Sequence, residues 1–208
     1  AFNGAVFDTV ILPEGLLSIG INAFEYSGIK SITIPSTVNN IGYQAFVACD
    51  SLETVIISDG VKEISEGMFR GCTALQTVIV PSSITKFGED PFDDCKPFGN
   101  VWTCGRYIGN EDNPYAVLIG INEEYYEDYY EEQPKFTVHE DTVAIALPLS
   151  DVNAEILYLS DNIKYIGDGA FTSYCYITTI YYNGSHKDWL LVECGSKNDF
   201  SNISVICK

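Results

Sequence analysis

Two histidines and seven cysteines are the residues of this chain that could act as nucleophiles or metal ligands. His139 and His186 are isolated, and the cysteines include no C-x-x-C pair or comparable metal-ligand spacing. The sequence contains no G-x-S-x-G, no glycine-rich phosphate loop and no H-E-x-x-H. A pairing of Cys104 with a distant histidine is the remaining catalytic alternative. We therefore expect a protein with no catalytic residues, no metal site and no cofactor.

A tract rich in tyrosine and acidic residues is the second stretch whose side chains could bind a ligand. Glu123 to Glu132 contains six acids and four tyrosines, which are Tyr125, Tyr126, Tyr129 and Tyr130. Tyrosines offer rigid contact area, and the acids could favour a basic partner or hold calcium loosely. No D-x-D-x-D-G loop is present. The tract is therefore a candidate ligand-binding insertion, and a solvated acidic loop is the alternative.

The charge balance excludes several classes of partner. The 208 residues include 29 acids and 11 basic residues, which gives a formal net charge of −18. Such a chain is not expected to bind nucleic acid or an anionic membrane surface. No apolar run approaches the length of about 18 residues that a membrane span needs, and no basic-then-apolar leader opens the sequence. We expect no membrane insertion and no signal peptide in this stretch.

The elements that must position these residues are set by an internal repeat. Three columns of residues recur every 23 positions: Val38, Val61 and Ile84; Phe46, Phe69 and Phe92; and Cys49, Cys72 and Cys95. A fixed period between about 20 and 29 residues predicts a leucine-rich-repeat solenoid. An odd number of cysteines excludes a complete set of disulfides within one chain. The cysteine column predicts a stacked row of small buried thiols.

Each repeat divides into a strand and a second segment. Ile32–Ile34 and its equivalents are short and β-branched, which predicts strands that form a parallel sheet. In the following residues, apolar side chains recur at Val38, Ile41, Ala45 and Phe46. Spacings of three and four residues predict a short α-helical or 3₁₀ segment across the back. The expected fold is an α/β repeat with the sheet on its concave face.

The repeat pattern breaks after Phe98 and resumes before the end. Two strand-like runs flank the turn GNEDNP and predict an embedded β-hairpin, followed by the acidic tract. Near the end, Ser185 and Asp188 form a capping box that predicts a short helix from His186, and residues 203–207 predict a last strand. We expect one leucine-rich-repeat domain over residues 1–208, with regular repeats at 1–98, the insertion at 99–136, repeats at 137–182 and a C-terminal cap at 183–208.

The residues that point outward from the strands are the candidates for binding. Because side chains alternate along a strand, Val10, Ile32, Val55, Val78, Leu157 and Ile180 are predicted to point inward. The outward column is then Ile11, Thr33, Ile56, Ile79, Tyr158 and Tyr181, flanked by Lys30, Glu53 and Gln76 among others. Apolar and aromatic groups stacked on an open face can form an interaction patch. The alternative is that β-branched residues occur there because they favour strands.

The repeat I-x-I-P-x-x-V-x-x-I-G-x-x-A-F-x-x-C-x-x-L resembles that of the BspA-like leucine-rich-repeat proteins. The match is clearest at Ile32, Ile34, Pro35, Val38, Ile41, Gly42, Ala45, Phe46, Cys49 and Leu52. Ser58 and Pro91 depart from the pattern, and so does the long acidic tract. The resemblance implies a bacterial surface or secreted protein, since several members act as adhesins for host matrix proteins or other cells.

These observations together favour recognition without chemistry. The expected partner is an extracellular protein or glycan, bound through the concave face. A structural role, in which the array is a spacer that displays another domain, is the alternative. The chain starts within a repeat, so we expect a fragment of a longer array.

Overall fold

The computed structural model describes residues 1–96, 98–102, 105–121 and 135–208. The chain forms two compact units. Unit 1 consists of Ala1–Gly99 and Ile108–Pro114, and unit 2 of Asn100–Tyr107 and Tyr115–Lys208. The expectation of a single domain over the whole chain stays a prediction.

Short strands make up nearly all of the regular structure. In unit 1 they are β1 (Ser18–Ile19), β2 (Ser31–Ile34), β3 (Asn40–Ile41), β4 (Thr54–Ile57), β5 (Glu63–Ile64), β6 (Thr77–Ile79) and β7 (Lys86–Phe87). The remaining elements are β8 (Asn100–Trp102), β9 (Gly105–Ile108), β10 (Val117–Ile121), β11 (Lys135–Thr137), β12 (Ala144–Ile145), a 3₁₀ turn (Leu149–Asp151), β13 (Ile156–Leu159), β14 (Tyr165–Ile166), β15 (Thr179–Tyr182), α1 (His186–Trp189), β16 (Glu193–Cys194) and β17 (Ser204–Cys207).

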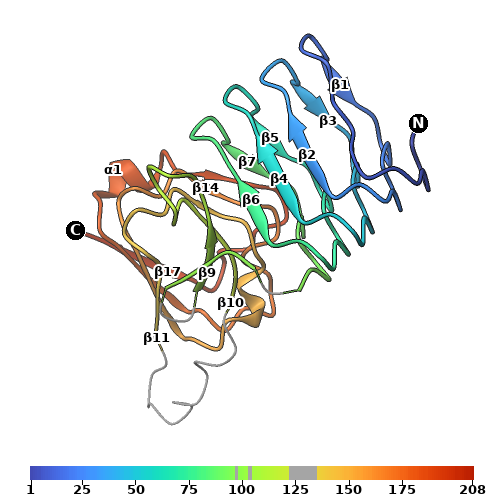
Figure 1. Cartoon of the computed structure of the whole chain (residues 1–208). Coiled ribbons are helices and arrows are strands. Elements are labelled where there is room, and N and C mark those ends of the chain that lie inside the picture. The colour runs from blue at the N-terminus through green and yellow to red at the C-terminus, as the bar shows by residue number, and fades with distance from the viewer. Residues whose placement is uncertain (97, 103–104, 122–134) are drawn as a thin grey trace. The chain divides into compact units, whose positions relative to one another are not determined.

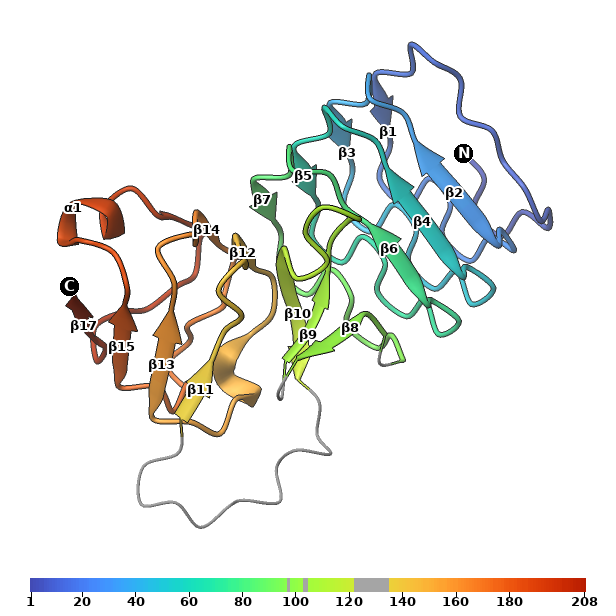
Figure 2. The same cartoon turned by 60° about the vertical axis from the view of Figure 1, so that its left-hand side comes forward.

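Unit 1 is a stack of coils in which each coil contributes a long strand and a short one (Figures 1 and 2). The long strands pair in parallel in the order β2-β4-β6, with Ile32 opposite Val55 and Val55 opposite Val78. The short strands pair as β1-β3 and β5-β7, also in parallel. The stacked parallel strands confirm the predicted leucine-rich-repeat solenoid.

The core of unit 1 consists of the inward rows of the repeat. Of the residues predicted to point inward in this unit, Ile32, Val55 and Val78 are buried and Val10 is half-buried. Leu157 and Ile180, which belong to unit 2, are buried as well. Phe24, Phe46 and Phe69 stack face to face, with ring centroids 5.0 and 5.6 Å apart. One apolar side of a coil cannot be buried by that coil alone, so the neighbouring coils complete it.

The prediction of short helical segments across the back of the repeats is wrong. In the structure each of these segments is a series of turns that follows a two-residue strand. An α-helix needs its N–H groups for bonds within itself. Here the N–H groups bond to the neighbouring coil, as Gln44 does to the Glu66 carbonyl and Phe46 to the Met68 carbonyl. The bonds between coils therefore replace those within a helix, and the repeat is a β-solenoid with very little helix.

Backbone conformation excludes a helix at the same place. Two positions of each back segment have positive φ, and in one coil these are Gln44 (52°) and Ala48 (54°). Their counterparts in the next coil are Gly67 and Gly71, with φ of 58° and 72°. Left-handed residues cannot continue a right-handed helix. Gly67, Gly71 and, in another coil, Asp90 and Asp94 are residue types that tolerate positive φ, whereas Gln44 and Ala48 are not typical of such positions.

Unit 2 repeats the arrangement with two larger sheets. The long strands form a parallel sheet in the order β11-β13-β15-β17, shown side by side in Figure 2. The short strands β10, β12, β14 and β16 pair in parallel on the other side of the coils. In this sheet Ile145 lies opposite Ile166, so the coils after the insertion stack in register.

The short helix and the last strand that were predicted after residue 182 are both present. The helix α1 begins after Ser185, whose hydroxyl oxygen accepts from the Asp188 N–H, while the Asp188 carboxylate accepts from the Ser185 N–H at 3.0 Å. Trp189 packs edge-on against the buried ring of Tyr182. β17 pairs with β15 as the last strand of its sheet.

The insertion differs in detail from the prediction. The antiparallel pair is β8 with β9, which places Val101 opposite Arg106. β9 and β10 flank the predicted turn and are neighbours in one sheet. The four tyrosines of the acidic tract, Tyr125, Tyr126, Tyr129 and Tyr130, lie outside the described residues, so their proposed role stays a prediction.

Candidate binding surface

The outward face of the sheet β11-β13-β15-β17 carries one row of side chains in register. Thr137 lies opposite Tyr158, Tyr158 opposite Tyr181, and Tyr181 opposite Ile206. Residues opposite each other on neighbouring parallel strands point to the same face. The structure thus brings together Tyr158 and Tyr181, which the sequence placed in the outward column, and adds Thr137 and Ile206 to them.

The two tyrosines of this row are stacked on each other. Their ring centroids are 5.2 Å apart and their planes differ by 12°. Nearly parallel rings at this separation are offset, so part of each ring face stays open. Tyr181 is 38% exposed and Tyr158 is half-buried. The pair is a rigid aromatic surface that is available to a ligand.

A groove of about 410 Å³ lies over this row, at the carboxyl ends of the four strands. We call it the tyrosine groove. Its lining combines the row itself with residues that immediately follow the strands: Thr137, Val138, Glu140, Tyr158, Leu159, Ser160, Tyr181, Tyr182, Asn183, Ile206, Cys207 and Lys208. A concave, mainly apolar site with a few polar groups is the usual form of a ligand pocket.

Sequence reasoning missed the polar rim of this groove. Glu140, Asn183 and Lys208 lie just beyond β11, β15 and β17. Two of them could have been found from their position in the repeat. Asn183 lies two residues after the outward residue Tyr181, and Lys208 lies two residues after the outward residue Ile206.

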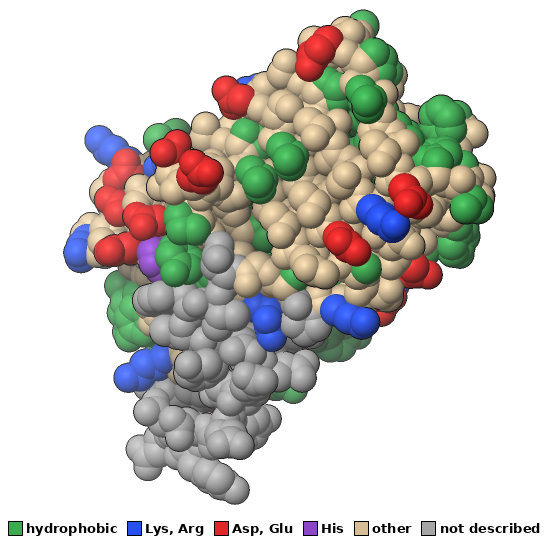
Figure 3. Space-filling view, in the orientation of Figure 1, with side chains coloured by type: hydrophobic (Ala, Val, Ile, Leu, Met, Phe, Trp, Pro, Cys, Tyr) green, Lys and Arg blue, Asp and Glu red, His purple; other side chains and the backbone are tan. Residues whose placement is uncertain are grey.

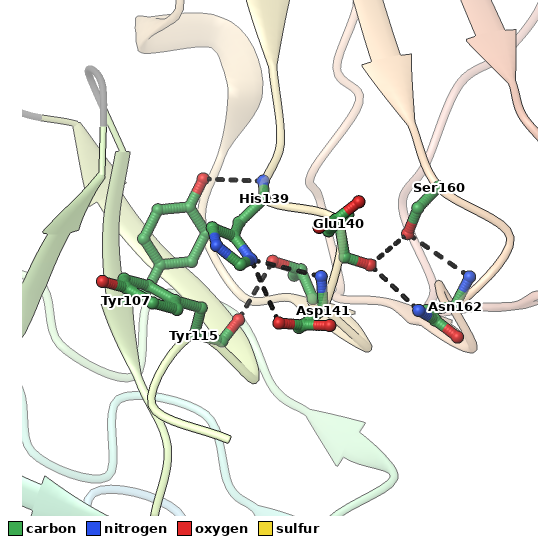
Figure 4. A network of polar contacts seen from close by, with 8 residues as sticks. Tyr107, Tyr115, His139, Glu140, Asp141, Ser160 and Asn162 are labelled. Atoms are coloured by element: carbon green, nitrogen blue, oxygen red, sulfur yellow. Dashed lines mark hydrogen bonds and ion pairs between the residues drawn. The ribbon is translucent and has the colours of Figure 1, made fainter. Parts of the chain in front are cut away.

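Hydrogen bonds hold one end of the groove in place (Figure 4). The Glu140 carbonyl accepts from the Ser160 hydroxyl at 2.7 Å and from the Asn162 amide at 3.0 Å. The Ser160 hydroxyl oxygen in turn accepts from the Asn162 N–H at 3.3 Å. These contacts tie the turn after β11 to the turn after β13, which fixes the backbone from which the Glu140 carboxylate projects.

His139 belongs to an aromatic cluster behind this turn (Figure 4). Its ring stacks on Tyr115 with centroids 4.1 Å apart, and Tyr107 packs edge-on against both rings. The His139 Nδ1 atom accepts from the Asp141 N–H at 3.2 Å, and the His139 N–H donates to the Tyr107 hydroxyl oxygen. These contacts pack the His139 ring between the strands of the insertion and the turn after β11.

The corresponding row of unit 1 has no tyrosines. Thr33, Ile56 and Ile79 lie opposite one another and are exposed, as predicted for the outward column. Lys30, in the flanking column, forms an exposed ion pair with Asp8 at 3.0 Å. The hydrogen bond and charge of Asp8 raise the pKa of Lys30.

The remaining unit 1 candidates are also at the surface. Glu53 and Gln76 are exposed, in the column beside the row. Ile11 is 89% exposed and lies outside the described strands. Figure 3 shows hydrophobic side chains gathered on unit 1 at the end that carries the N-terminus, and Phe2, Val6, Ile11, Leu17 and Ile21 are among those exposed.

The thiols are placed for packing. Every cysteine in the described part of the chain is a free thiol, and Cys104 lies outside it. Cys49 and Cys72 are fully buried, as the stacked row predicted. The adjacent Cys49 and burial raise the pKa of Cys72, and burial raises the pKa of Cys95 to about 12. Protonated thiols are poor nucleophiles and poor metal ligands.

Two further findings concern the described residues only. They contain no group of three His, Cys, Asp or Glu side chains that could hold a metal ion. Nor do the described ranges include a helix with the length and apolar character of a membrane span.

The repeat itself identifies the family. A model of the BspA type leucine rich repeat region matches six copies in this chain, at residues 1–102 and 149–191. The chain belongs to this family. Residues 103–148, between the BspA-type copies, include the acidic tract and the turn that carries Glu140. None of the curated proteins matches the chain.

Three solved structures are similar to this chain, and one of them, with a TM-score above 0.5, shows the same fold. The pneumococcal vaccine antigen PcpA has a TM-score of 0.51 at 14% identity, covering 100% of this chain and 64% of that one. A leucine-rich repeat protein from Bacteroides ovatus ATCC 8483 has a TM-score of 0.48 at 18% identity, with 97% and 51% covered. A leucine rich cell surface protein from Faecalibacterium prausnitzii A2-165 has a TM-score of 0.35 at 19% identity, with 89% and 56% covered. The chain therefore spans between half and two thirds of each of these structures.

Proposed function

We propose that this chain is a non-enzymatic recognition module that binds an extracellular ligand through the tyrosine groove. The observation that carries the proposal is the in-register stack of Tyr158 and Tyr181 inside a groove of about 410 Å³. Rigid aromatic rings give a ligand large contact area at a low cost in side-chain entropy. Family membership, and the printed description of one structure as a cell surface protein, support a surface or secreted setting.

Adhesion to host matrix proteins, cells or glycans is the activity that fits such a module. The backbone bonds that join the coils do not use the side chains of the outward rows, and the stacked pair Tyr158 and Tyr181 keeps part of its surface exposed. Ile56, Ile79 and Tyr181 are all 38% exposed, which makes them matched positions on the two sheets. A charged residue at each position tests which sheet face binds.

The test measures binding of the purified chain to immobilised host matrix proteins and to host cells. We expect dissociation constants in the micromolar range or tighter, and we expect Tyr181→Lys to abolish binding with little change in melting temperature. Ile56→Lys and Ile79→Lys are the controls, which we expect to bind normally. Loss of binding only in these two variants would move the site to unit 1. No binding of the unmodified chain at micromolar concentrations would favour the spacer role.

A further inference from the structure

We propose that the tyrosine groove accepts a pyranose ring of a neutral oligosaccharide, seated above Thr137 against the open face of the Tyr158 ring. The proposal rests on the proposed function, because it names the ligand class for the same groove. Three features of the groove carry it: an interruption in the aromatic row, a floor without available backbone groups, and a polar rim.

The interruption lies at Thr137. Neighbouring strands are about 4.8 Å apart, and the rings of Tyr158 and Tyr181 follow this step with centroids 5.2 Å apart. Thr137 is the partner of Tyr158 on its other side and carries no ring. Within the part of the chain that the structure describes, the face of Tyr158 turned toward β11 therefore has no aromatic neighbour. A ligand ring placed above Thr137 would continue the stack at the same spacing.

The backbone at the groove floor is already paired. The Val138 N–H donates to the Tyr158 carbonyl at 3.1 Å, the Asn183 N–H to the Leu159 carbonyl at 2.9 Å, and the Lys208 N–H to the Gly184 carbonyl at 3.1 Å. A peptide that binds as an added strand needs a row of free backbone groups along one edge. The groove crosses four strands instead, so its ligand must be recognised by side chains.

The side chains at the rim suit hydroxyl groups. The Glu140 carboxylate follows β11, which carries the proposed seat, and the Ser160 hydroxyl follows the neighbouring strand β13. Ser160 keeps acceptor capacity beside its bonds to Glu140 and Asn162, and the Asn183 amide lies further along the groove. A carboxylate accepts hydrogen bonds, whereas a hydroxyl and an amide can both donate and accept them. A pyranose matches this set, because its C–H face packs on a ring and its equatorial hydroxyls reach outward to polar groups.

The negative charge of the protein restricts the proposed ligand to neutral sugars. The chain carries a formal charge of −18, which repels sulfated or sialylated glycans at a distance. Glu140 lies beside the proposed seat, whereas Lys208 follows β17, on the opposite edge of the sheet from β11. An anionic sugar at the Thr137 seat would therefore meet a carboxylate.

The experiment titrates the whole chain with neutral tetrasaccharides of glucose, galactose, mannose and N-acetylglucosamine, read by saturation-transfer NMR and calorimetry. We expect at least one of them to bind, with a weaker or absent response to sialyllactose and to a heparin tetrasaccharide. Tyr158→Ala should weaken binding by about tenfold or more, as expected for an aromatic anchor. Absence of binding by every neutral tetrasaccharide, or stronger binding by the anionic sugars, would overturn the proposal.

A second variant fills the seat without removing a contact. Thr137→Tyr extends the aromatic row over β11 and should abolish sugar binding while keeping the melting temperature. Thr33→Tyr, at an exposed outward position of β2, is the matched control and should bind sugar normally. Normal sugar binding by Thr137→Tyr would place the sugar elsewhere and overturn the assignment.

A parallel measurement separates this proposal from the proposed function. Matrix glycoproteins are tested before and after enzymatic removal of their glycans. Binding that survives deglycosylation, with no tetrasaccharide bound, overturns the sugar assignment and leaves protein recognition standing. Absence of binding to glycoproteins, cells and sugars alike overturns both.

Discussion

The Sγ atom of Cys72 lies 3.2 Å from the carbonyl oxygen of Phe46 and donates a hydrogen bond to it from the next coil. Cys49 makes the same bond to Phe24 at 3.0 Å, and Cys95 to Phe69 at 3.1 Å. The cysteine column is thus the hydrogen-bond donor to the carbonyls of the phenylalanine column. This pairing explains why a small side chain with a weak donor recurs at a fully buried position.

Removing one of these donors should destabilise the fold. Cys72→Ala leaves the buried Phe46 carbonyl without that donor, so we expect the free energy of unfolding to fall by about 1–3 kcal/mol. Cys72→Ser retains a donor and should lose less, since Ser27 occupies the equivalent buried position two coils earlier. Urea denaturation measures both, and a larger loss for the serine variant would contradict the hydrogen-bond role.

The stacked phenylalanines supply a second test. Phe46 is fully buried between Phe24 and Phe69, and we expect Phe46→Ala to cost about 3–5 kcal/mol. Phe2 stacks on Phe24 at the end of the same row but is 45% exposed, so Phe2→Ala is the matched control and should cost much less. Denaturant midpoints at constant m-value report the difference. Equal losses would contradict the prediction, because Phe46 buries more area than Phe2 and stacks on two rings.

Asn198 connects three segments near the C-terminal cap. Its Nδ2 group donates to the carbonyls of Gly167 and Gly195, both at 2.9 Å, and its Oδ1 accepts from the Phe171 N–H at 2.8 Å. We expect Asn198→Ala to cost about 1–3 kcal/mol. Asn198→Asp should cost more at neutral pH, because a carboxylate would face two carbonyl oxygens. Thermal melts at pH 7 and in acid check this, and the aspartate variant should recover part of its stability as the carboxyl becomes protonated.

The capping box of α1 predicts a dependence on pH. Hydrogen bonds from Ser185 lower the pKa of Asp188 below its usual range. A carboxyl whose pKa is lowered by folding adds stability above its unfolded pKa and loses it as the pH falls through the folded pKa. Asp188→Asn should therefore have a lower melting temperature than the unmodified chain at pH 7, and the gap should close in acid. A gap that is independent of pH would show that the charge is unimportant.

The repeat could be predicted from sequence because its signals are local and recur. The inward positions Ile32, Val55 and Val78 are apolar and β-branched, and the structure buries all three. The capping box at Ser185 is another local signal, and the helix begins where it predicts. The stacked parallel strands of the solenoid and the short helix at His186 follow from such patterns, whereas the α/β assignment does not hold, because the back segments are not helices.

The back segments could not be predicted, because apolar spacing alone does not reveal backbone conformation. Val38, Ile41 and Ala45 have spacings that suit a helix, yet their coil is bonded to the next one through Gln44 and Phe46. A helix and a coil with two left-handed residues can bury the same apolar positions. The hydrogen bonds between neighbouring coils determine which of the two conformations forms.

Part of the tyrosine groove could be predicted from the sequence. Tyr158 and Tyr181 were placed in the outward column, and the structure stacks them. The rim residue Glu140 could not be anticipated, because its position depends on the bonds from Ser160 and Asn162 that hold the turn after β11. Contacts of this kind involve turns, where no periodic signal exists.

The separation between the bonded backbone and the outward row also has an evolutionary consequence. The bonds that join coils come from the backbone and from inward rows, such as that of Cys72 with Phe46. A substitution at Thr137 or Tyr158 changes what the groove presents without altering the ladder beneath it. Selection can therefore revise ligand preference one strand at a time, and related arrays can diverge in specificity while they keep a common scaffold.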